Sequence, residues 1–205
     1  MEAAGRQRAI EGERAQRIVE AMRSSVARRG VTGSTFDQVA REAGVSRGLL
    51  HYYFGTKERL LAEVVRRDAD VRLAVLDRRL AGARSADDFV SRLVAALDEM
   101  VSQEPEQVQL GFELFTLSRR NEEVAAELRE TLRRARDHVA SLLAAKQAEG
   151  VLRLRAEPAA VADVLFALSD GIALRLLADP GPGPRAAVPA AAAAVRALVD
   201  DGDGV

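Results

Sequence analysis

The sequence predicts an all-α protein, with a small three-helix N-terminal head joined by one long helix to a larger helical body. Three observations carry this prediction. Apolar residues recur at helical spacing along most of the 205 residues. No segment alternates as a β-strand does, and residues 36–54 read as two short helices around a glycine turn. We expect the head to occupy residues 1–60 and the body residues 61–205.

The first helix of the head is predicted from about Glu13 to Arg29. An apolar stripe runs through it at helical spacing, and Gly30 stops it. Residues 1–12 are polar and include Arg6 and Arg8. We expect a frayed terminus there, with an arm that contacts DNA as the alternative.

The stretch from Phe36 to Arg59 organises the head. Ala40 is small enough for a second helix to cross above it. Gly44 stands where the first helix ends in a left-handed turn, and Ser46 stands at the N-cap of the second. This arrangement is a helix-turn-helix, whose second helix enters the DNA major groove.

The second helix runs from Ser46 to about Phe54, with Leu50 facing inward at 100° per residue. Gly48 costs helix stability, so we expect a packing or functional reason for it. Leu49 contacts a thymine methyl group if exposed and adds to the core if buried. The residues expected to face DNA are Arg47, Gly48, Leu49, His51 and Tyr52, and the expected backbone anchors are Thr35, Ser46, Tyr53 and Lys57.

The segment TFDQVAREAGVSRGLLHYYFGTKERLL resembles the DNA-binding domain of the tetracycline-repressor (TetR) family of bacterial regulators. The resemblance covers about Arg14 to Leu61. The rest of the chain is similar to the family only in its helical layout and in a DGIALRLLADP segment. The resemblance implies a homodimer that releases DNA when a small molecule enters the larger domain. Leu49 departs from the polar residue often found there in the family.

Charge is distributed unevenly along the chain. Residues 1–60 carry eleven Lys and Arg against seven Asp and Glu, whereas residues 61–205 carry nineteen against twenty-four. A basic head on an acidic body suits a protein that contacts DNA at one end. Cysteine is absent, which excludes a thiolate site. With no apolar run of membrane-spanning length and no signal-peptide pattern, we expect no membrane association and a cytoplasmic location.

A long helix is predicted from Thr56 to about Ala81, spanning head and body as one rod that can couple them. Further helices are predicted for Ala86–Gln103, Pro105–Arg119, Asn121–Glu149, Pro158–Ala178 and Ala186–Asp200. The last two are so apolar that we expect them to pair with their symmetry mates in a four-helix dimer interface. If Val195 lies at that interface, Val195→Glu should dissociate or unfold the dimer. An internal helical hairpin is the alternative.

Enzyme chemistry has little support in the sequence. Residues Gly44–Gly48 match the G-x-S-x-G nucleophile elbow, but that motif needs a strand before Ser46. The two histidines, His51 and His138, form no ligand cluster, and the acidic end near Asp201 lacks later calcium ligands. We therefore expect no catalytic residue, metal or cofactor.

An apolar effector pocket between body helices is predicted only by large side chains, bordered by two polar ones. Those polar side chains fit ordinary surface or interhelical roles equally well. The predicted pocket residues are Phe89, Leu93, Met100, Phe112, Glu113, Phe115, His138 and Phe166.

We therefore hypothesise a homodimeric transcriptional repressor that binds a palindromic double-stranded operator. A small, largely hydrophobic effector of unknown identity releases it. An effector-independent helical DNA-binding protein is the alternative, and the sequence does not distinguish repression from activation.

Overall fold

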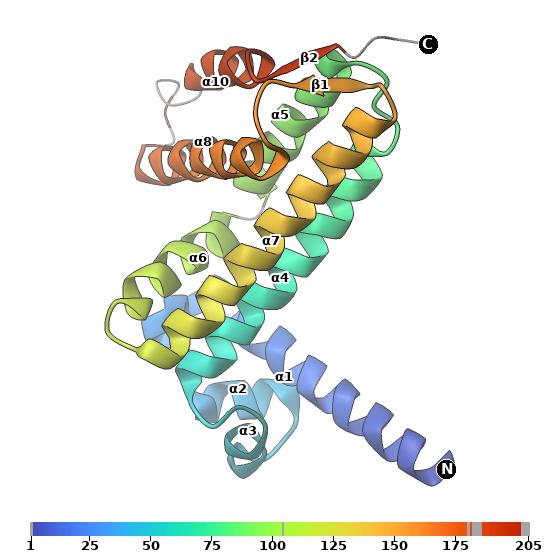
Figure 1. Cartoon of the computed structure of the whole chain (residues 1–205). Helices are drawn as coiled ribbons and strands as arrows, with labels where there is room; N and C mark the ends of the chain where they lie inside the picture. The colour runs from blue at the N-terminus through green and yellow to red at the C-terminus, as the bar shows by residue number, and fades with distance from the viewer. Residues whose placement is uncertain (1, 104, 180, 182–185, 202–205) are drawn as a thin grey trace. The chain divides into compact units, whose positions relative to one another are not determined.

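The computed structural model describes residues 2–103, 105–179, 181 and 186–201 (Figure 1). The chain divides into two compact units. The first comprises Met1–Asp68 and Leu110–Leu128, and the second comprises Ala69–Gln109 and Arg129–Val205. The all-α prediction is confirmed apart from one short sheet. The functional division at residues 60 and 61 remains a prediction, and the first unit takes in a later segment that the sequence did not assign to the head.

The helices of the first unit follow the predicted order. Helix α1 begins earlier than expected and bends at Gly30, whose φ of 70° lies in the left-handed region. The helices that contribute residues to this unit are α1 (Glu2–Gly33), α2 (Phe36–Ala43), α3 (Arg47–Phe54), α4 (Lys57–Leu80), α6 (Pro105–Ser118) and α7 (Glu122–Ala148).

The turn predicted at Gly44 and the cap predicted at Ser46 are confirmed, whereas α1 continues past Gly30, the residue predicted to stop it, to Gly33. Thr35 caps α2 in a capping box, in which its hydroxyl oxygen accepts from the Gln38 amide and the Gln38 side chain accepts from the Thr35 amide. Gly44 closes α2 at φ 65°. Ser46 Oγ accepts from the Leu49 amide, and Thr56 Oγ1 accepts from the Arg59 amide. These short-range bonds fix where α3 begins and how it leaves α2.

One hydrophobic core holds the first unit together. Met22 of α1, Val39 of α2, Leu50 of α3 and Leu60 of α4 are each fully buried in it. Buried residues from α6 and α7 complete the same core: Leu110, Leu114 and Val124. The position of α3 therefore depends on a segment more than fifty residues away in sequence.

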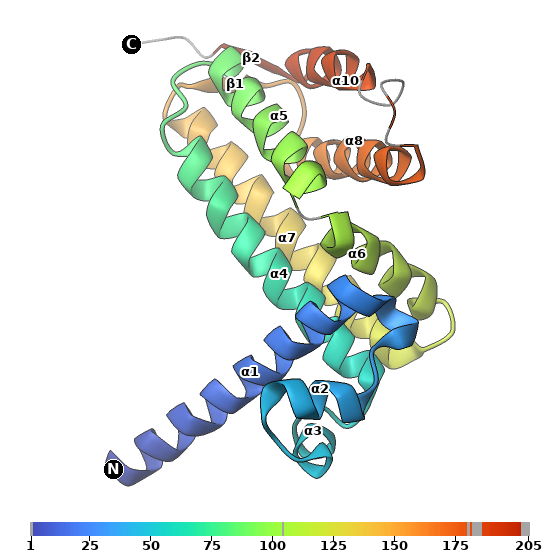
Figure 2. The same cartoon turned by 180° about the vertical axis from the view of Figure 1, so that it is seen from behind.

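The second unit contains α5 (Ala86–Gln103), α8 (Pro158–Ala178), α10 (Ala187–Arg196) and the remaining parts of α4, α6 and α7. Figures 1 and 2 both show α7 running alongside α4. Helix α5 packs against α8 and α10 around a core that includes Phe89, Leu143 and Val161.

The carbonyl groups at the end of α4 are satisfied by two side chains. The ammonium of Lys146, which is buried, donates to the Ala81 carbonyl at 3.1 Å, and Arg92 donates to the Arg79 carbonyl at 2.9 Å. Helix ends leave such carbonyls without intrahelical partners, so these bonds fix the end of α4 inside the second unit.

Two features of the second unit correct the sequence prediction. Strands β1 (Leu152–Leu154) and β2 (Val199–Asp201) form an antiparallel pair, with Leu154 opposite Val199, where the sequence predicted no sheet. The last helix therefore ends at Arg196 rather than Asp200. Three-residue strands are too short to show alternation, which is why the pattern missed them.

Val195, which the sequence named as a test residue for the dimer interface if it lay there, is buried within the single chain. Its side chain is only 7% exposed and packs in the core of the second unit. The exposed apolar residues in this region lie instead on α8, where Val164 is 40% exposed and Leu174 is 51% exposed. No helix among the described residues combines the length and apolar character needed to cross a lipid bilayer.

Candidate nucleic-acid interface

Helix α3 presents a polar face to solvent. Its exposed residues are Arg47, Gly48, His51 and Tyr52, and the Tyr52 side chain is 79% exposed. Leu49 is half-buried, so its side chain packs partly against the protein and remains partly available for contact with a thymine methyl group. Tyr53 and Phe54 pack partly against the core of the first unit. The turn and cap thus hold a short helix whose outer side offers hydrogen-bonding groups.

Arg47 is held by neighbours on two sides. Its Nη1 lies 3.3 Å from each carboxylate oxygen of Asp37 on α2, and its Nε lies 3.5 Å from Nε2 of His51. His51 Nδ1 donates to the Gly55 carbonyl at 2.9 Å, which leaves Nε2 as an acceptor. The His51 ring also packs edge to face against the Phe36 ring, with the two ring centroids 4.9 Å apart. The sequence predicted Arg47 and His51, but not Asp37.

The expected anchors surround this face. Thr35 and Ser46 cap the N-termini of α2 and α3. Each hydroxyl oxygen accepts a hydrogen bond from the backbone amide three residues later. Lys57 was expected to point at a phosphate; its ammonium donates to the Val31 carbonyl at 2.5 Å. An ammonium carries three N–H donors, so this bond positions Lys57 without using all of them.

Gly48 has no packing reason to be glycine. A Cβ built there would meet only Ser46 Oγ at 3.9 Å, an ordinary van der Waals distance. Of the two reasons predicted for this residue, the functional one remains.

Two arginines of α1 are paired with one carboxylate of α2. Arg28 and Arg29 each donate to Glu42 at 2.6 Å. Hydrogen bonds from Arg29 and then Arg28 hold the pKa of Glu42 below its ordinary value, against a smaller opposing effect of burial. These ion pairs link α1 to α2 and do not involve Arg47. They help to fix the two helices against which α3 packs.

Ser46 lacks the surroundings of a nucleophile. A helix, α2, precedes it instead of a strand, and its oxygen accepts from the Leu49 amide. Each nitrogen of His51 is engaged elsewhere, by Gly55 and Arg47. The elbow geometry required for a hydrolase is not formed. Within the described residues, no group of three or more potential metal ligands occurs.

The predicted effector residues are divided between the two units. Phe112, Glu113 and Phe115 belong to the first, where the Phe115 side chain is 57% exposed. The second unit holds the others: Phe89, which is fully buried, Leu93 and Phe166, which are partly buried, His138 on α7, and Met100, whose side chain lies outside the described residues. Because the sequence did not show which helices are neighbours, it assigned one pocket to residues of two units.

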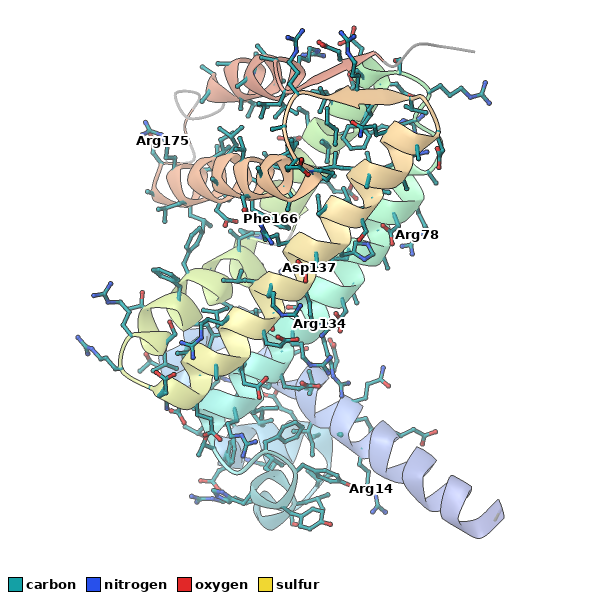
Figure 3. All side chains as sticks on the ribbon, viewed as in Figure 1. Arg14, Arg78, Arg134, Asp137, Phe166 and Arg175 are labelled. Carbon is teal, nitrogen blue, oxygen red and sulfur yellow. The ribbon has the colours of Figure 1, made fainter. Side chains whose placement is uncertain are left out.

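A hollow of about 460 Å³ lies in the second unit beside α4 and α7. His138 is the predicted residue among those lining it. Three side-chain contacts cross or border it: a hydrogen bond between His138 and Asp77 at 2.8 Å, and the ion pairs of Arg134 with Asp70 at 2.9 Å and of Arg133 with Asp137 at 2.7 Å. Figure 3 labels two of these side chains, Arg134 and Asp137, both on α7. A lining of this kind suits a polar ligand better than the apolar effector expected from the sequence.

Family comparisons agree with the geometry. A capped helix-turn-helix on a helical body defines a DNA-binding transcriptional regulator rather than an enzyme. Residues 18–64 match the family model of bacterial regulatory proteins of the tetR family, and residues 89–201 match the C-terminal region of BetI-type transcriptional repressors. The chain belongs to the TetR family, as its helix-turn-helix sequence indicated.

Individual proteins give the same result. The HTH-type transcriptional regulator BetI of Agrobacterium fabrum is 31% identical over 160 residues, covering 71% of this chain and 74% of that protein. A regulator from Saccharomonospora viridis in complex with choline superposes with a TM-score of 0.69 at 22% identity, covering 92% of this chain and 99% of the other. FadR of Bacillus subtilis in complex with stearoyl-CoA gives 0.69 at 15% identity, covering 93% and 98%. These two structures establish a shared fold.

Proposed function

We propose that the protein is a repressor that binds a palindromic operator as a homodimer and dissociates when a small molecule binds its body. The observation that carries the proposal is the exposed polar face of α3, held by the caps at Thr35 and Ser46. Membership of a regulator family, with a C-terminal region of BetI type, supports repression. Residues 1–60 would bind DNA, and residues 61–205 would carry effector binding and dimerisation.

The proposed DNA contacts are those expected from the sequence. Arg47, Gly48, Leu49, His51 and Tyr52 face the major groove, where base edges present donors, acceptors and the thymine methyl group. Thr35, Ser46, Tyr53 and Lys57 contact the phosphate backbone and set the register of the helix. Arg47 and Lys57 supply the positive charge.

The proposed dimer uses the exposed side of α8. Val164, Ala167, Gly171 and Leu174 are exposed in the single chain, and they recur at spacings of three and four residues. This is the spacing of a helix–helix seam. Asp170 lies on the same stretch, and burial by its surroundings raises its pKa, which Arg72 opposes. A second copy of the chain would cover these aliphatic groups. A dimer places two recognition helices on successive major grooves about 34 Å apart.

The effector remains the least constrained part of the proposal. Helices α4, α6 and α7 each have residues in both units, which supports transmission of a ligand's effect from the body to α3. The solved neighbours hold choline and stearoyl-CoA, so the shared fold does not select one effector chemistry. The lining of Asp, Arg and His residues in the second unit favours a ligand with polar groups over the largely hydrophobic effector expected from the sequence. A regulator of chromosomal DNA would work in the cytoplasm.

Selection from random duplex DNA tests the proposal. The full-length protein should enrich a palindrome whose half-sites lie about one helical turn apart. Enrichment of a single asymmetric site would refute the symmetric dimer, and no enrichment would refute sequence-specific binding.

Release is then tested by calorimetry with a ligand found by thermal-shift screening. Linkage requires the operator to weaken ligand binding by the same factor by which the ligand weakens operator binding. Equal ligand affinity with and without operator would support the effector-independent alternative.

A further inference from the structure

Asp37 stands out among the residues that the sequence did not connect with DNA. It lies in the first turn of α2, and both of its oxygens face Nη1 of Arg47 at 3.3 Å. The two residues are ten positions apart on different helices. A carboxylate is thus placed directly against the main cation of the recognition face.

Stability of the fold does not account for this contact. The Arg47 and Asp37 side chains are 59% and 62% exposed, and ion pairs between such exposed groups contribute little to folding. The caps and the buried core already fix α2 against α3. The effect of Asp37 therefore falls on what Arg47 can bind.

The guanidinium has one end engaged and one end available. Nη1 faces Asp37 and Nε faces His51, while Nη2 makes no hydrogen bond within the part of the chain that is described. An Arg held this way offers Nη2 to an acceptor in a fixed direction, which lowers the entropy lost on binding. The negative charge beside it opposes the approach of a phosphate.

We propose that Asp37 is a specificity-determining residue that acts through Arg47; this inference rests on the proposed DNA recognition by α3. Asp37 cancels the charge that Arg47 would otherwise lend to any duplex, and it holds the guanidinium for a base acceptor in the major groove. Guanine, with O6 and N7 on one edge, is the base that best matches this donor. Asp37 thus weakens binding to non-operator DNA and sharpens the choice of one base pair.

The test compares operator and scrambled duplexes. The full-length wild type, Asp37→Asn and Asp37→Ser are titrated at several salt concentrations against the selected operator and a scrambled duplex of equal length. For both variants, the ratio of operator to scrambled affinity should fall about tenfold, the lower part of the range for loss of one base contact. The salt slope for the scrambled duplex should steepen by about one unit, because Arg47 becomes free to neutralise a phosphate.

Two controls separate this effect from a general change of charge. Glu13→Gln makes the same charge change on α1, at an exposed residue for which the described part of the chain shows no ion pair, and should leave the ratio within twofold of wild type. In an Arg47→Ala background, Asp37→Asn should not change the ratio.

The inference is overturned if the ratio of either folded Asp37 variant stays within twofold of wild type, or if it falls equally without Arg47. Thermal melts establish folding, and serine is included because it also suits the first turn of a helix. Failure to select any operator with the wild type would instead refute the proposed function.

Discussion

Helices α3 and α8 each expose one side to solvent, and the chemistry of the two sides is opposite. On α3 the exposed groups are Arg47, His51 and Tyr52, and two of these are hydrogen-bonded to neighbours. On α8 the large exposed apolar groups are Val164 and Leu174. A hydrogen-bonding face can bind a hydrated polyanion such as DNA. An aliphatic face is stabilised only when another apolar surface covers it and removes it from water.

The two helices would keep the proposed DNA contact and the proposed dimer contact apart in one chain. The proposed DNA face of α3 is pre-organised by contacts within the first unit, so Arg47 and His51 are oriented before a partner binds. The α8 face has no such internal network in its aliphatic residues, so its contribution depends on burial alone. Substitutions should therefore act on affinity and sequence preference in α3, and on assembly in α8.

The largest expected effect is on α8. Leu174→Glu should dissociate the proposed dimer, because it places a charge in a buried apolar contact at a cost of several kcal/mol. The monomer should keep its fold, since Leu174 is exposed in the single chain. Sedimentation velocity gives the mass, and circular dichroism gives the helix content.

A matched control is available on another helix of the same unit. Val71→Glu on α4, where the valine is 63% exposed, should leave the dimer intact. Val195→Glu should unfold the second unit instead, because that residue is in its core. A Leu174→Glu protein that sediments as a dimer would place the interface elsewhere.

Arg47→Ala should have the next largest effect. Loss of a base contact should weaken operator binding by about 1–3 kcal/mol and relax the preference at one base pair. Lys57→Ala should weaken binding to operator and scrambled duplexes alike, with a salt slope shallower by about one unit. Fluorescence anisotropy measures each affinity. Wild-type affinity in both variants would exclude α3 as the recognition helix.

Gly48→Ala separates folding from function within one helix. Alanine is favoured over glycine in a helix by about 1 kcal/mol, and there is room for its Cβ, so the melting temperature should rise. Operator affinity should fall, because the methyl group keeps the backbone from approaching DNA. A variant that is more stable and binds as tightly as wild type would leave Gly48 without a role in recognition.

The smallest effect concerns Glu42 and its pH dependence. Hydrogen bonds from Arg29 and Arg28 lower the pKa of Glu42 in the folded state. These contacts therefore stabilise the folded protein at pH values above 4.5, the ordinary pKa of a glutamate. That stabilisation is lost as the pH falls through the folded pKa. Glu42→Gln should therefore reduce the free energy of unfolding at pH 7 by about 0.5 kcal/mol, a value typical of a screened surface pair.

Chemical denaturation at pH 7 and pH 3.5 measures this difference. It should shrink at the lower pH, because the carboxylate of the unfolded chain, with its ordinary pKa of 4.5, takes up a proton there and the folded ion pair loses its advantage. A difference that is constant with pH would assign the effect to packing of the side chain.

The head was predictable because its signals are local. The turn at Gly44 and the cap at Ser46 each act within a few residues, so their spacing located α2 and α3. The capping box at Thr35 is equally local, but the prediction did not use it. The contact between Asp37 and Arg47 depends on how the two helices are rotated about their axes, which spacing does not determine. The prediction therefore reached the right helix and missed one of its neighbours.

The body was less predictable, for reasons visible in particular residues. In the last helix, alanine occupies nearly every side, so no apolar stripe distinguished the buried Val195 from an exposed position. Leu154 pairs with Val199, 45 positions later in the sequence, and the two strands are joined by only three residue pairs. The expected pocket required knowledge of neighbouring helices, and its members on α6 belong to the other unit.

The discontinuous core of the first unit has a consequence for synthesis of the protein. Residues through Asp68 emerge first, but Leu110, Leu114 and Val124 complete the same core. At roughly 5–20 residues per second, the ribosome needs about 3–12 s to add the 60 residues between positions 68 and 128. During that interval the nascent helix-turn-helix has an open apolar side. We expect its amides to become fully protected from exchange only after Leu128 has left the ribosome.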